Sequence, residues 1–269
     1  MCLNVRQRTL QTSIATTHRG TIDAAADHKG ATRTLVLVAA RDEAARLAAT
    51  LAGLARAFPQ GELWVADDGS RDSSALIARA AGARVVRGER PLGKGGAITR
   101  AAREALRGAE PATVVVLCDG DLGASAGELA PLAGAVRGGA DLAVAGFRTR
   151  AGGGFGVALG FARWAIRRRC GMSTRAPLSG QRALTAATLG ALLPLARGYG
   201  MEVGMTIDVV RAGGTVAELE LELEHRVLGR TPAGFLHRAR QLADCARAYA
   251  ARGGAERVTL GTMGGTALR

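Results

Sequence analysis

From residue 33 onward, short runs of apolar residues alternate with segments in which apolar residues recur at helical spacing. The run from Thr34 to Ala40 is apolar almost throughout, as is typical of a strand buried on both faces of a parallel sheet. Residues 42–57 then place Leu47, Leu51 and Leu54 on one stripe, which predicts a helix. The same patterns predict strands at 62–66, 83–86, 113–117 and 141–145, and helices at 72–81, 95–107 and 125–137. This alternation predicts an α/β protein with a doubly wound, mostly parallel sheet and helices on both faces.

After residue 146 the pattern becomes less regular. It predicts helices at 161–169, 201–212 and 234–251, a strand at 216–223, a glycine-rich loop at 152–154 and irregular structure at 177–180. The first 30 residues have no apolar period, so we expect a disordered leader at 1–30. The end rich in Gly and Thr predicts a flexible tail at 253–269. Between them we expect a single domain at 31–252, divided into halves at 31–146 and 147–252.

Composition narrows the class of protein. Lysine and arginine total 36 against 23 acidic residues, a formal net charge of +13, yet aromatic residues make up only 3% of the chain. Because proteins that bind single strands or RNA need aromatic stacking platforms, we expect no nucleic-acid partner. No apolar run approaches the ~18 residues of a membrane-spanning helix, and no secretory signal is visible. The four cysteines form no CxxC pair, which favours a cytoplasmic protein without a zinc site.

Acidic residues follow the fourth predicted strand. Asp119 and Asp121 flank a single glycine there, and the carboxyl ends of parallel strands are where such sheets bind ligands. Two carboxylates leaving a buried strand suit a hard divalent cation shared with substrate phosphates. The alternative is an ordinary acidic turn.

Two further motifs follow the second and third strands. In Asp67-Asp68-Gly69-Ser70, a carboxylate can accept a hydrogen bond from a base or ribose, or the turn can simply begin a helix. In Gly93-Lys94-Gly95, backbone amides at a helix start suit a phosphate, and Lys94 is one of only two lysines in the chain. A P-loop is disfavoured because Gly95 occupies the position where Ser or Thr binds Mg²⁺. We therefore expect Lys94 to face substrate phosphates.

Taken together, these motifs resemble the nucleotide-sugar glycosyltransferases of the family 2 type, which have the glycosyltransferase-A fold. The segment from Ala39 to Glu43 is similar to the start of their uridine pocket, and the "DDGS" turn and the DxD element both have counterparts here. The resemblance implies that 31–146 binds the nucleotide and 147–252 the acceptor.

A narrower resemblance is to glucosyl-3-phosphoglycerate synthases. The similar segments are Gly93-Lys94-Gly95, Pro177-Leu178-Ser179-Gly180-Gln181, the stretch from Gly198 to Gly204, and His225-Arg226. His225-Arg226 corresponds to the family's "HRN" segment, but Val227 stands where the family has Asn. Without the resemblance, His225 and Arg226 could equally well be a polar pair on the surface or contacts to a metal ion and a diphosphate.

The resemblance implies a metal-dependent hexosyltransferase that uses Mg²⁺ or Mn²⁺. The donor would be a nucleoside diphosphate sugar of the UDP-glucose type, and the acceptor a small anion such as a phosphoglycerate-like molecule. The implied roles are catalytic for Asp121, Glu202 and Lys94, donor-binding for Ala39, Ala40, Glu43, Asp68, Lys94, Asp119 and Arg226, and metal-binding for Asp121 and His225. A polyprenyl-phosphate sugar transferase at a membrane surface, and more remotely a nucleotidyltransferase, stay open as alternatives, as do peripheral membrane contact and a homodimer.

Overall fold

The computed structural model describes residues 33–147, 156–224 and 232–253. Its strands are β1 (Thr34–Ala40), β2 (Gly61–Asp67), β3 (Arg84–Arg87), β4 (Val114–Asp119), β5 (Leu142–Phe147), β6 (Arg182–Thr185) and β7 (Val216–Leu221). Its α-helices are α1 (Ala44–Ala57), α2 (Ser74–Ala80), α3 (Lys94–Ala105), α4 (Ala130–Arg137), α5 (Val157–Cys170), α6 (Ala186–Leu192), α7 (Gly200–Arg211) and α8 (Pro232–Ala251), and a 3-10 helix, η1, spans Gly123–Leu129. The expected leader, the 152–154 loop and the expected tail after its first residue lie outside the described residues.

One mixed sheet contains all seven strands, in the order β3-β2-β1-β4-β6-β5-β7. β6 runs antiparallel to β4 and β5, and every other pair is parallel. The predicted α/β fold is confirmed. The sequence pattern did not predict β6, a strand of four residues that follows the segment expected to be irregular. Its insertion between β4 and β5 makes the sheet mixed.

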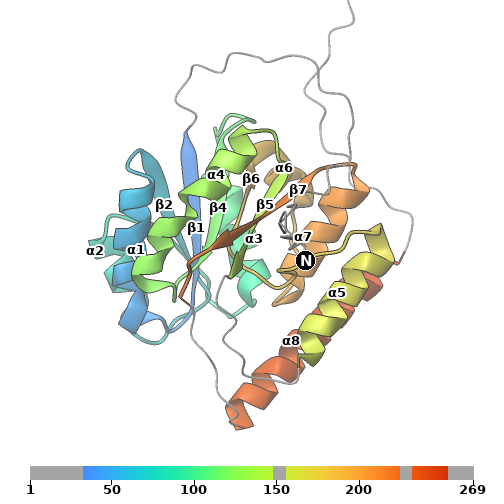
Figure 1. The fold of residues 1–269 in the computed structure, drawn as a ribbon. Coiled ribbons are helices and arrows are strands. Elements are labelled where there is room, and N and C mark those ends of the chain that lie inside the picture. Colours follow the sequence, from blue (N-terminus) through green and yellow to red (C-terminus); the bar gives the residue numbers. More distant parts are fainter. Residues whose placement is uncertain (1–32, 148–155, 225–231, 254–269) are drawn as a thin grey trace, which may run out of the picture. The chain divides into compact units, whose positions relative to one another are not determined.

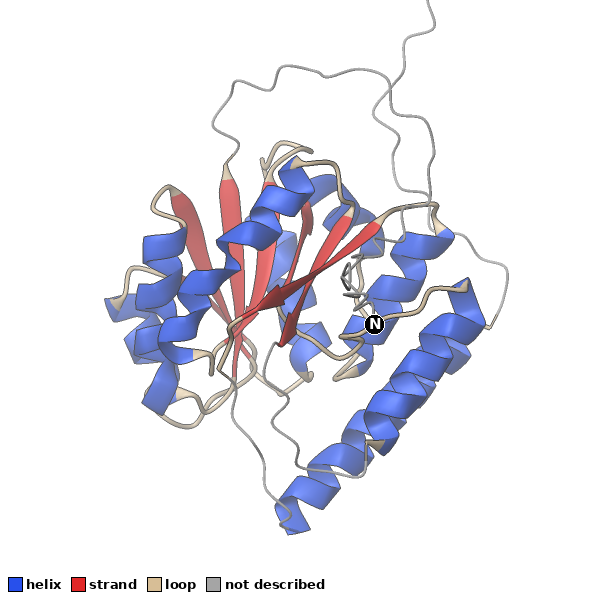
Figure 2. Ribbon diagram, in the orientation of Figure 1, coloured by secondary structure: helices blue, strands red, loops and turns tan. Residues whose placement is uncertain are grey.

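Two layers of helices cover the sheet (Figures 1 and 2). On one face, α1, η1 and α4 pack against the sheet, and Leu47, Leu51 and Leu54 of α1 are buried there as the apolar stripe predicts. On the other face lie α3, α6 and α7. Burial on both sides explains why β1 and β4 are apolar runs without a polar alternation.

A third layer lies outside α7. The helices α5 and α8 run side by side in Figure 1, and both pack on α7 through buried residues that include Ile166, Ile207 and Cys245. α7 is therefore covered on both sides, which explains why nine of its residues are buried. No helix in the described part of the chain is both long and apolar enough to cross a bilayer.

Candidate active site

A cavity of about 940 Å³ opens at the carboxyl ends of β1 and β4, between the sheet and α8. It is lined by every predicted site residue that the structure describes: Ala39, Ala40, Glu43, Asp68, Lys94, Asp119, Asp121 and Glu202. His225 and Arg226 lie outside the described residues, so their roles stay predictions. Residues from distant parts of the chain thus meet in one cleft, as expected for the strand ends of an open α/β sheet.

Lys94 lies at the centre of a buried ion-pair network. Its Nζ is 2.5 Å from Oδ1 of Asp119 and 2.8 Å from Oε1 of Glu202. Burial alone would lower the pKa of Lys94, but the charges of the two carboxylates raise it well above its ordinary value. Lys94 therefore remains a cation and fixes one oxygen of each partner.

Glu202 presents its other oxygen without a partner. The side chain projects from the first turn of α7, is only 2% exposed and lines the cavity. Among the described residues, no group hydrogen-bonds to its Oε2. An unsatisfied buried acceptor is costly, so this oxygen is ready to accept a hydrogen bond from a bound ligand.

The buried Arg182 of β6 is linked by hydrogen bonds to the part of α7 that carries Glu202. Its guanidinium donates to the Ser179 carbonyl at 2.8 Å and to Oγ1 of Thr206 at 2.9 Å, and Thr206 in turn donates to the carbonyl of Glu202. Burial lowers the pKa of Arg182 to about 10, against the raising effect of the Glu202 and Glu218 charges. Arg182 thus ties the loop before β6 to the helix that presents Glu202.

Asp121 differs from the other carboxylates of the cleft. In the described structure its side chain forms no ion pair, whereas Oδ1 of Asp119 is taken by Lys94 and Oδ2 accepts a hydrogen bond from Gln181 at 3.0 Å. Burial, and then the charge of Asp119, raise the pKa of Asp121. The arrangement leaves Asp121 available to a cation.

The oxygen ligands present fit a hard divalent ion that completes its shell with substrate. Mg²⁺ is commonly bound by one or two carboxylates together with substrate phosphates, and Asp121 supplies one carboxylate that no ion pair occupies in the described structure. No cluster of three or more metal-binding side chains occurs within the described ranges. Further ligands would therefore come from substrate, water or the segment that contains His225.

Two glycines set the position of Lys94. Gly93 has φ +75°, in the left-handed region that favours glycine, and α3 begins directly after it. Gly180 faces the tip of Lys94 so closely that a Cβ at this position would collide with Nζ and with the carboxylate of Asp119. The loop before β6 and the loop before α3 thus close tightly around the ammonium group.

Asp68 holds the same loop from the opposite side. It is 4% exposed, and its two oxygens accept hydrogen bonds from the backbone amides of Leu92 at 2.6 Å and Gly93 at 2.9 Å. The expected contact of Asp68 with a nucleobase stays a prediction. Its anchoring of the Gly-Lys loop is a role that the sequence did not indicate.

α8 contributes residues that sequence reasoning missed. Arg240, Asp244 and Arg247 recur at spacings of four and three on this helix and line the cavity. Oδ2 of Asp244 accepts a hydrogen bond from the amide of Tyr199, at the start of α7. The signal available in the sequence was the polar, i, i+4, i+7 stripe on the basic helix predicted at 234–251.

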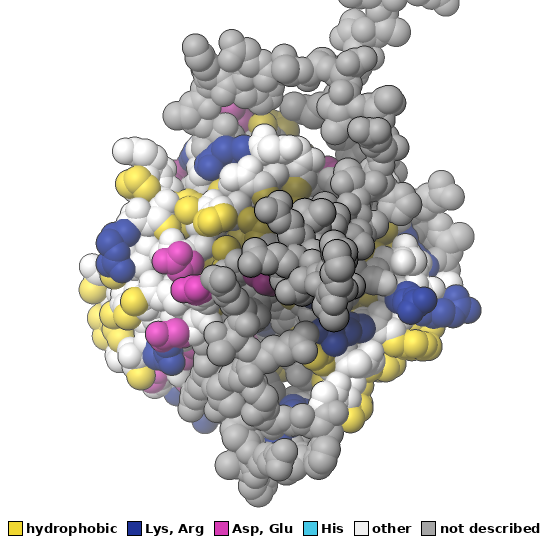
Figure 3. All heavy atoms as spheres, viewed as in Figure 1, with side chains coloured by type: hydrophobic (Ala, Val, Ile, Leu, Met, Phe, Trp, Pro, Cys, Tyr) yellow, Lys and Arg dark blue, Asp and Glu magenta, His cyan; other side chains and the backbone are white. Residues whose placement is uncertain are grey.

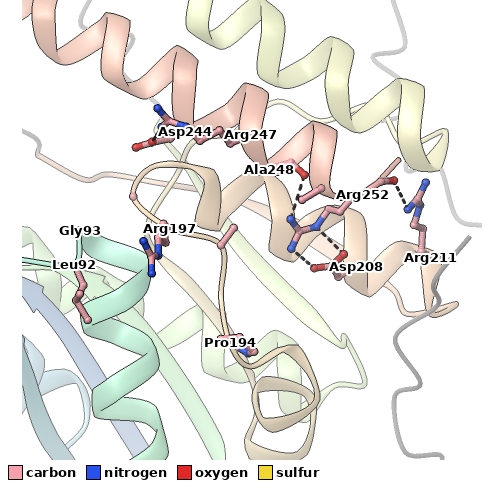
Figure 4. A pocket seen from close by; sticks show the side chains of 13 residues that line it. Leu92, Gly93, Pro194, Arg197, Asp208, Arg211, Asp244, Arg247, Ala248 and Arg252 are labelled. Carbon is pink, nitrogen blue, oxygen red and sulfur yellow. Dashed lines mark hydrogen bonds and ion pairs between the residues drawn. The ribbon is translucent and has the colours of Figure 1, made fainter. Parts of the chain in front are cut away.

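A second cavity, of about 1090 Å³, adjoins the first and shares Gly93, Gly198, Asp244 and Arg247 with it (Figure 4). Arg252 follows α8, and its Nε donates to Oδ1 of Asp208 on α7 at 2.7 Å. Asp244 and Arg252 therefore connect α8 to α7 at two points, and α8 forms one wall of the cleft.

A mixed α/β sheet with a lysine, glycine turns and carboxylates gathered at its strand ends is the arrangement that the sequence motifs imply for an enzyme of the glycosyltransferase-A type. The chain belongs to glycosyl transferase family 2, whose model matches residues 35–177, a little over half of its length. It is therefore a glycosyltransferase, as the sequence motifs predict. The resemblance stated from those motifs is confirmed.

Solved structures agree with this assignment. Glucosyl-3-phosphoglycerate synthase from Mycobacterium tuberculosis in complex with Mn²⁺, UDP-glucose and phosphoglyceric acid is 28% identical, with a TM-score of 0.65 over 82% of this chain and 80% of that one. The same enzyme with Mn²⁺, UDP-glucose and glycerol 3-phosphate is 27% identical, with a TM-score of 0.64 over 82% and 81%. Among curated proteins, none matches this chain.

Proposed function

We propose that this enzyme transfers a hexose from a nucleoside diphosphate sugar of the UDP-glucose type to a small anionic acceptor such as a phosphoglycerate-like molecule, with Mg²⁺ or Mn²⁺. The observation that carries the proposal is the cleft in which Lys94 fixes Asp119 and Glu202 while Asp121 stays unpaired. The similarity to structures that hold Mn²⁺, UDP-glucose and phosphoglyceric acid supports it.

The donor binds at the ends of β1, β2 and β4. Ala39, Ala40 and Glu43 border the nucleoside, and Asp68 keeps the Gly-Lys loop in place beside it. Asp121 would hold the divalent ion, with His225 and Arg226 as predicted further contacts to the ion and the diphosphate, and Asp119 borders the donor. When bound, the ion supplies Lewis-acid stabilisation of the leaving diphosphate.

The acceptor binds between Glu202 and α8. Arg240 and Arg247 lie two turns apart on the face of α8 that lines the cavity, and both are exposed. Within the described residues Arg240 has no carboxylate partner, so its charge is available to an anion. Oε2 of Glu202 accepts a hydrogen bond from the acceptor hydroxyl. In an inverting reaction Glu202 takes that proton as general base, and in a retaining one it orients the hydroxyl.

The test is a transfer assay with the full chain, UDP-glucose, Mn²⁺ and phosphoglycerate. We expect release of UDP that depends on the anionic acceptor. In an Arg240→Ala variant the KM for the acceptor should rise about tenfold while the KM for the donor stays unchanged, because one charge-assisted contact contributes about 1.5 kcal/mol. Arg79→Ala, which removes an exposed arginine on α2, is the matched control.

Release of pyrophosphate instead of UDP would indicate a nucleotidyltransferase. Transfer only to a polyprenyl phosphate would favour the membrane-surface alternative. If no nucleotide sugar raises the melting temperature of the protein in the presence of Mg²⁺ or Mn²⁺, the donor assignment is wrong, because a ligand that binds the native state must stabilise it.

A further inference from the structure

Aromatic side chains gather at one place on the surface of this aromatic-poor chain. Of its nine aromatic residues, Phe161, Trp164 and Tyr249 form one cluster where α5 meets α8. The ring centroids of Trp164 and Tyr249 are 4.9 Å apart, and those of Phe161 and Trp164 are 5.5 Å apart. Trp164 nevertheless stays 51% exposed. A half-exposed tryptophan held in a cluster of aromatic rings is suited to contact with a partner.

The exposed face of α5 is also basic. Val157, which is 61% exposed, lies seven residues before Trp164 and therefore on the same face, and Arg167 and Arg168 follow Trp164 by three and four residues. Both arginines are exposed, and neither forms an ion pair in the described structure. α5 contains four arginines and no acidic residue. Figure 3 shows basic and hydrophobic side chains side by side over α5, at the right of the view.

The positive charge of this face of α5 indicates which kind of partner it binds. A second copy of the chain would bring the same arginines against one another in a twofold contact, and like charges oppose such a contact. An indole beside a row of arginines instead suits the boundary of a bilayer, where tryptophan lies at headgroup level and arginine is attracted to anionic lipids. We propose that the α5 face, defined by Val157, Trp164, Arg167 and Arg168, docks on a membrane surface that contains anionic lipids.

Docking at this face would place the cleft near the bilayer. α5 packs on α8, and α8 lines the catalytic cavity with Arg240 and Arg247 on another of its faces. The helix pair would therefore border both the membrane and the acceptor side of the cleft. The inference does not depend on the identity of donor or acceptor, because it concerns a surface outside the cavity.

The test is flotation of the full-length protein with vesicles. Phosphatidylcholine vesicles with about 30% phosphatidylserine are compared with pure phosphatidylcholine at low salt, and we expect binding only to the anionic vesicles and its loss in high salt. Arg167→Glu/Arg168→Glu should weaken the partition about thirtyfold or more, because each arginine near an anionic surface contributes about 1 kcal/mol. Trp164→Ala should weaken it about fivefold through the lost apolar contact.

The control carries the same change of charge elsewhere. Arg79→Glu/Arg107→Glu alters two exposed arginines, on α2 and just beyond α3, and should bind anionic vesicles like the wild type. Transferase activity and melting temperature report whether each variant is folded. The proposal is wrong if the wild type ignores anionic vesicles, or if the α5 variants and the control lose binding equally. It is also wrong if Trp164→Ala converts a dimer to a monomer, or if RNA binds this face while vesicles do not.

Discussion

Replacing Lys94 by methionine removes the charge at the centre of the cleft but keeps a side chain of similar length. The side chain of Lys94 is 15% exposed, and its ammonium group lies between two carboxylates, of which the Glu202 side chain is 2% exposed and the Asp119 side chain 30%. Removing one member of a buried ion pair costs about 3–5 kcal/mol, because the remaining charge is left buried without compensation. We expect the free energy of unfolding to fall by about 3 kcal/mol, near the lower limit of this range, because solvent screens the charge of Asp119.

The measurement is urea unfolding at pH 7, with Arg79→Met as the control for loss of an exposed arginine, which should stay within about 0.5 kcal/mol of the wild type. Lys94→Arg should also be destabilised, because Gly180 leaves no room beside Nζ for a guanidinium group. A Lys94 that only faces substrate phosphates, as the sequence predicts, would leave the stability without ligand near the wild-type value in the arginine variant. If both variants unfold at the urea concentration of the wild type, the buried network does not hold the site together.

The pH dependence follows from the raised pKa of Lys94. Since the folded protein keeps this proton more tightly than the unfolded chain, the contribution to stability is complete below about pH 10 and is lost only as pH rises beyond that value. The stability deficit of the methionine variant should therefore stay constant below about pH 10 and shrink as pH rises beyond that value, because the wild type then loses the contribution of the Lys94 charge. A deficit that does not change as pH rises from 7 to about 11 would contradict the electrostatic explanation.

Three further predictions concern the rest of the cleft. Asp121→Asn should lower transferase activity at least ~10²-fold while the melting temperature without ligand stays unchanged, and EDTA should abolish wild-type activity; an active variant would exclude the metal role. Asp68→Ala should weaken UDP binding by about 1–3 kcal/mol, because the amides of Leu92 and Gly93 lose their acceptor; calorimetry that gives equal affinities would refute this. Gly180→Ala should reduce kcat and stability together, because the new methyl group displaces Lys94 and Asp119; wild-type values for both would show that the loop can move aside.

The parallel half of the fold could be predicted because burial from two sides leaves its mark on the sequence. β1 and β4 lie between two helical layers and are therefore apolar at nearly every position. β6 carries no such mark, since it has four residues and begins with Arg182. Only the folded structure satisfies that guanidinium, through acceptors at Ser179 and Thr206. A strand that depends on a buried charge cannot be found from hydrophobic periodicity.

The location of the cleft could be predicted from the rule that ligands bind at the carboxyl ends of the strands. The ion pairs between the side chains inside the cleft could not. Lys94, Asp119 and Glu202 belong to α3, β4 and α7, and their mutual contacts depend on how these elements pack. From the sequence Lys94 was assigned to the donor phosphates, a contact that stays a prediction. In the structure described here it already has two carboxylate partners, so any phosphate contact must be made in addition to them.

The distribution of charges in the cleft indicates where a bound cation would relieve the most electrostatic repulsion. Six acidic side chains line the cavity in the described structure: Glu43, Asp68, Asp119, Asp121, Glu202 and Asp244. Lys94 compensates two of them, backbone amides hold Asp68 and Asp244, and Glu43 also has a partner. Asp121 forms no ion pair in the described structure, and burial and the charge of Asp119 raise its pKa against the opposing charges of Lys94 and Arg46. A divalent ion at Asp121 would relieve this repulsion and present its remaining positions to the diphosphate, which would couple donor binding to metal binding at a single carboxylate.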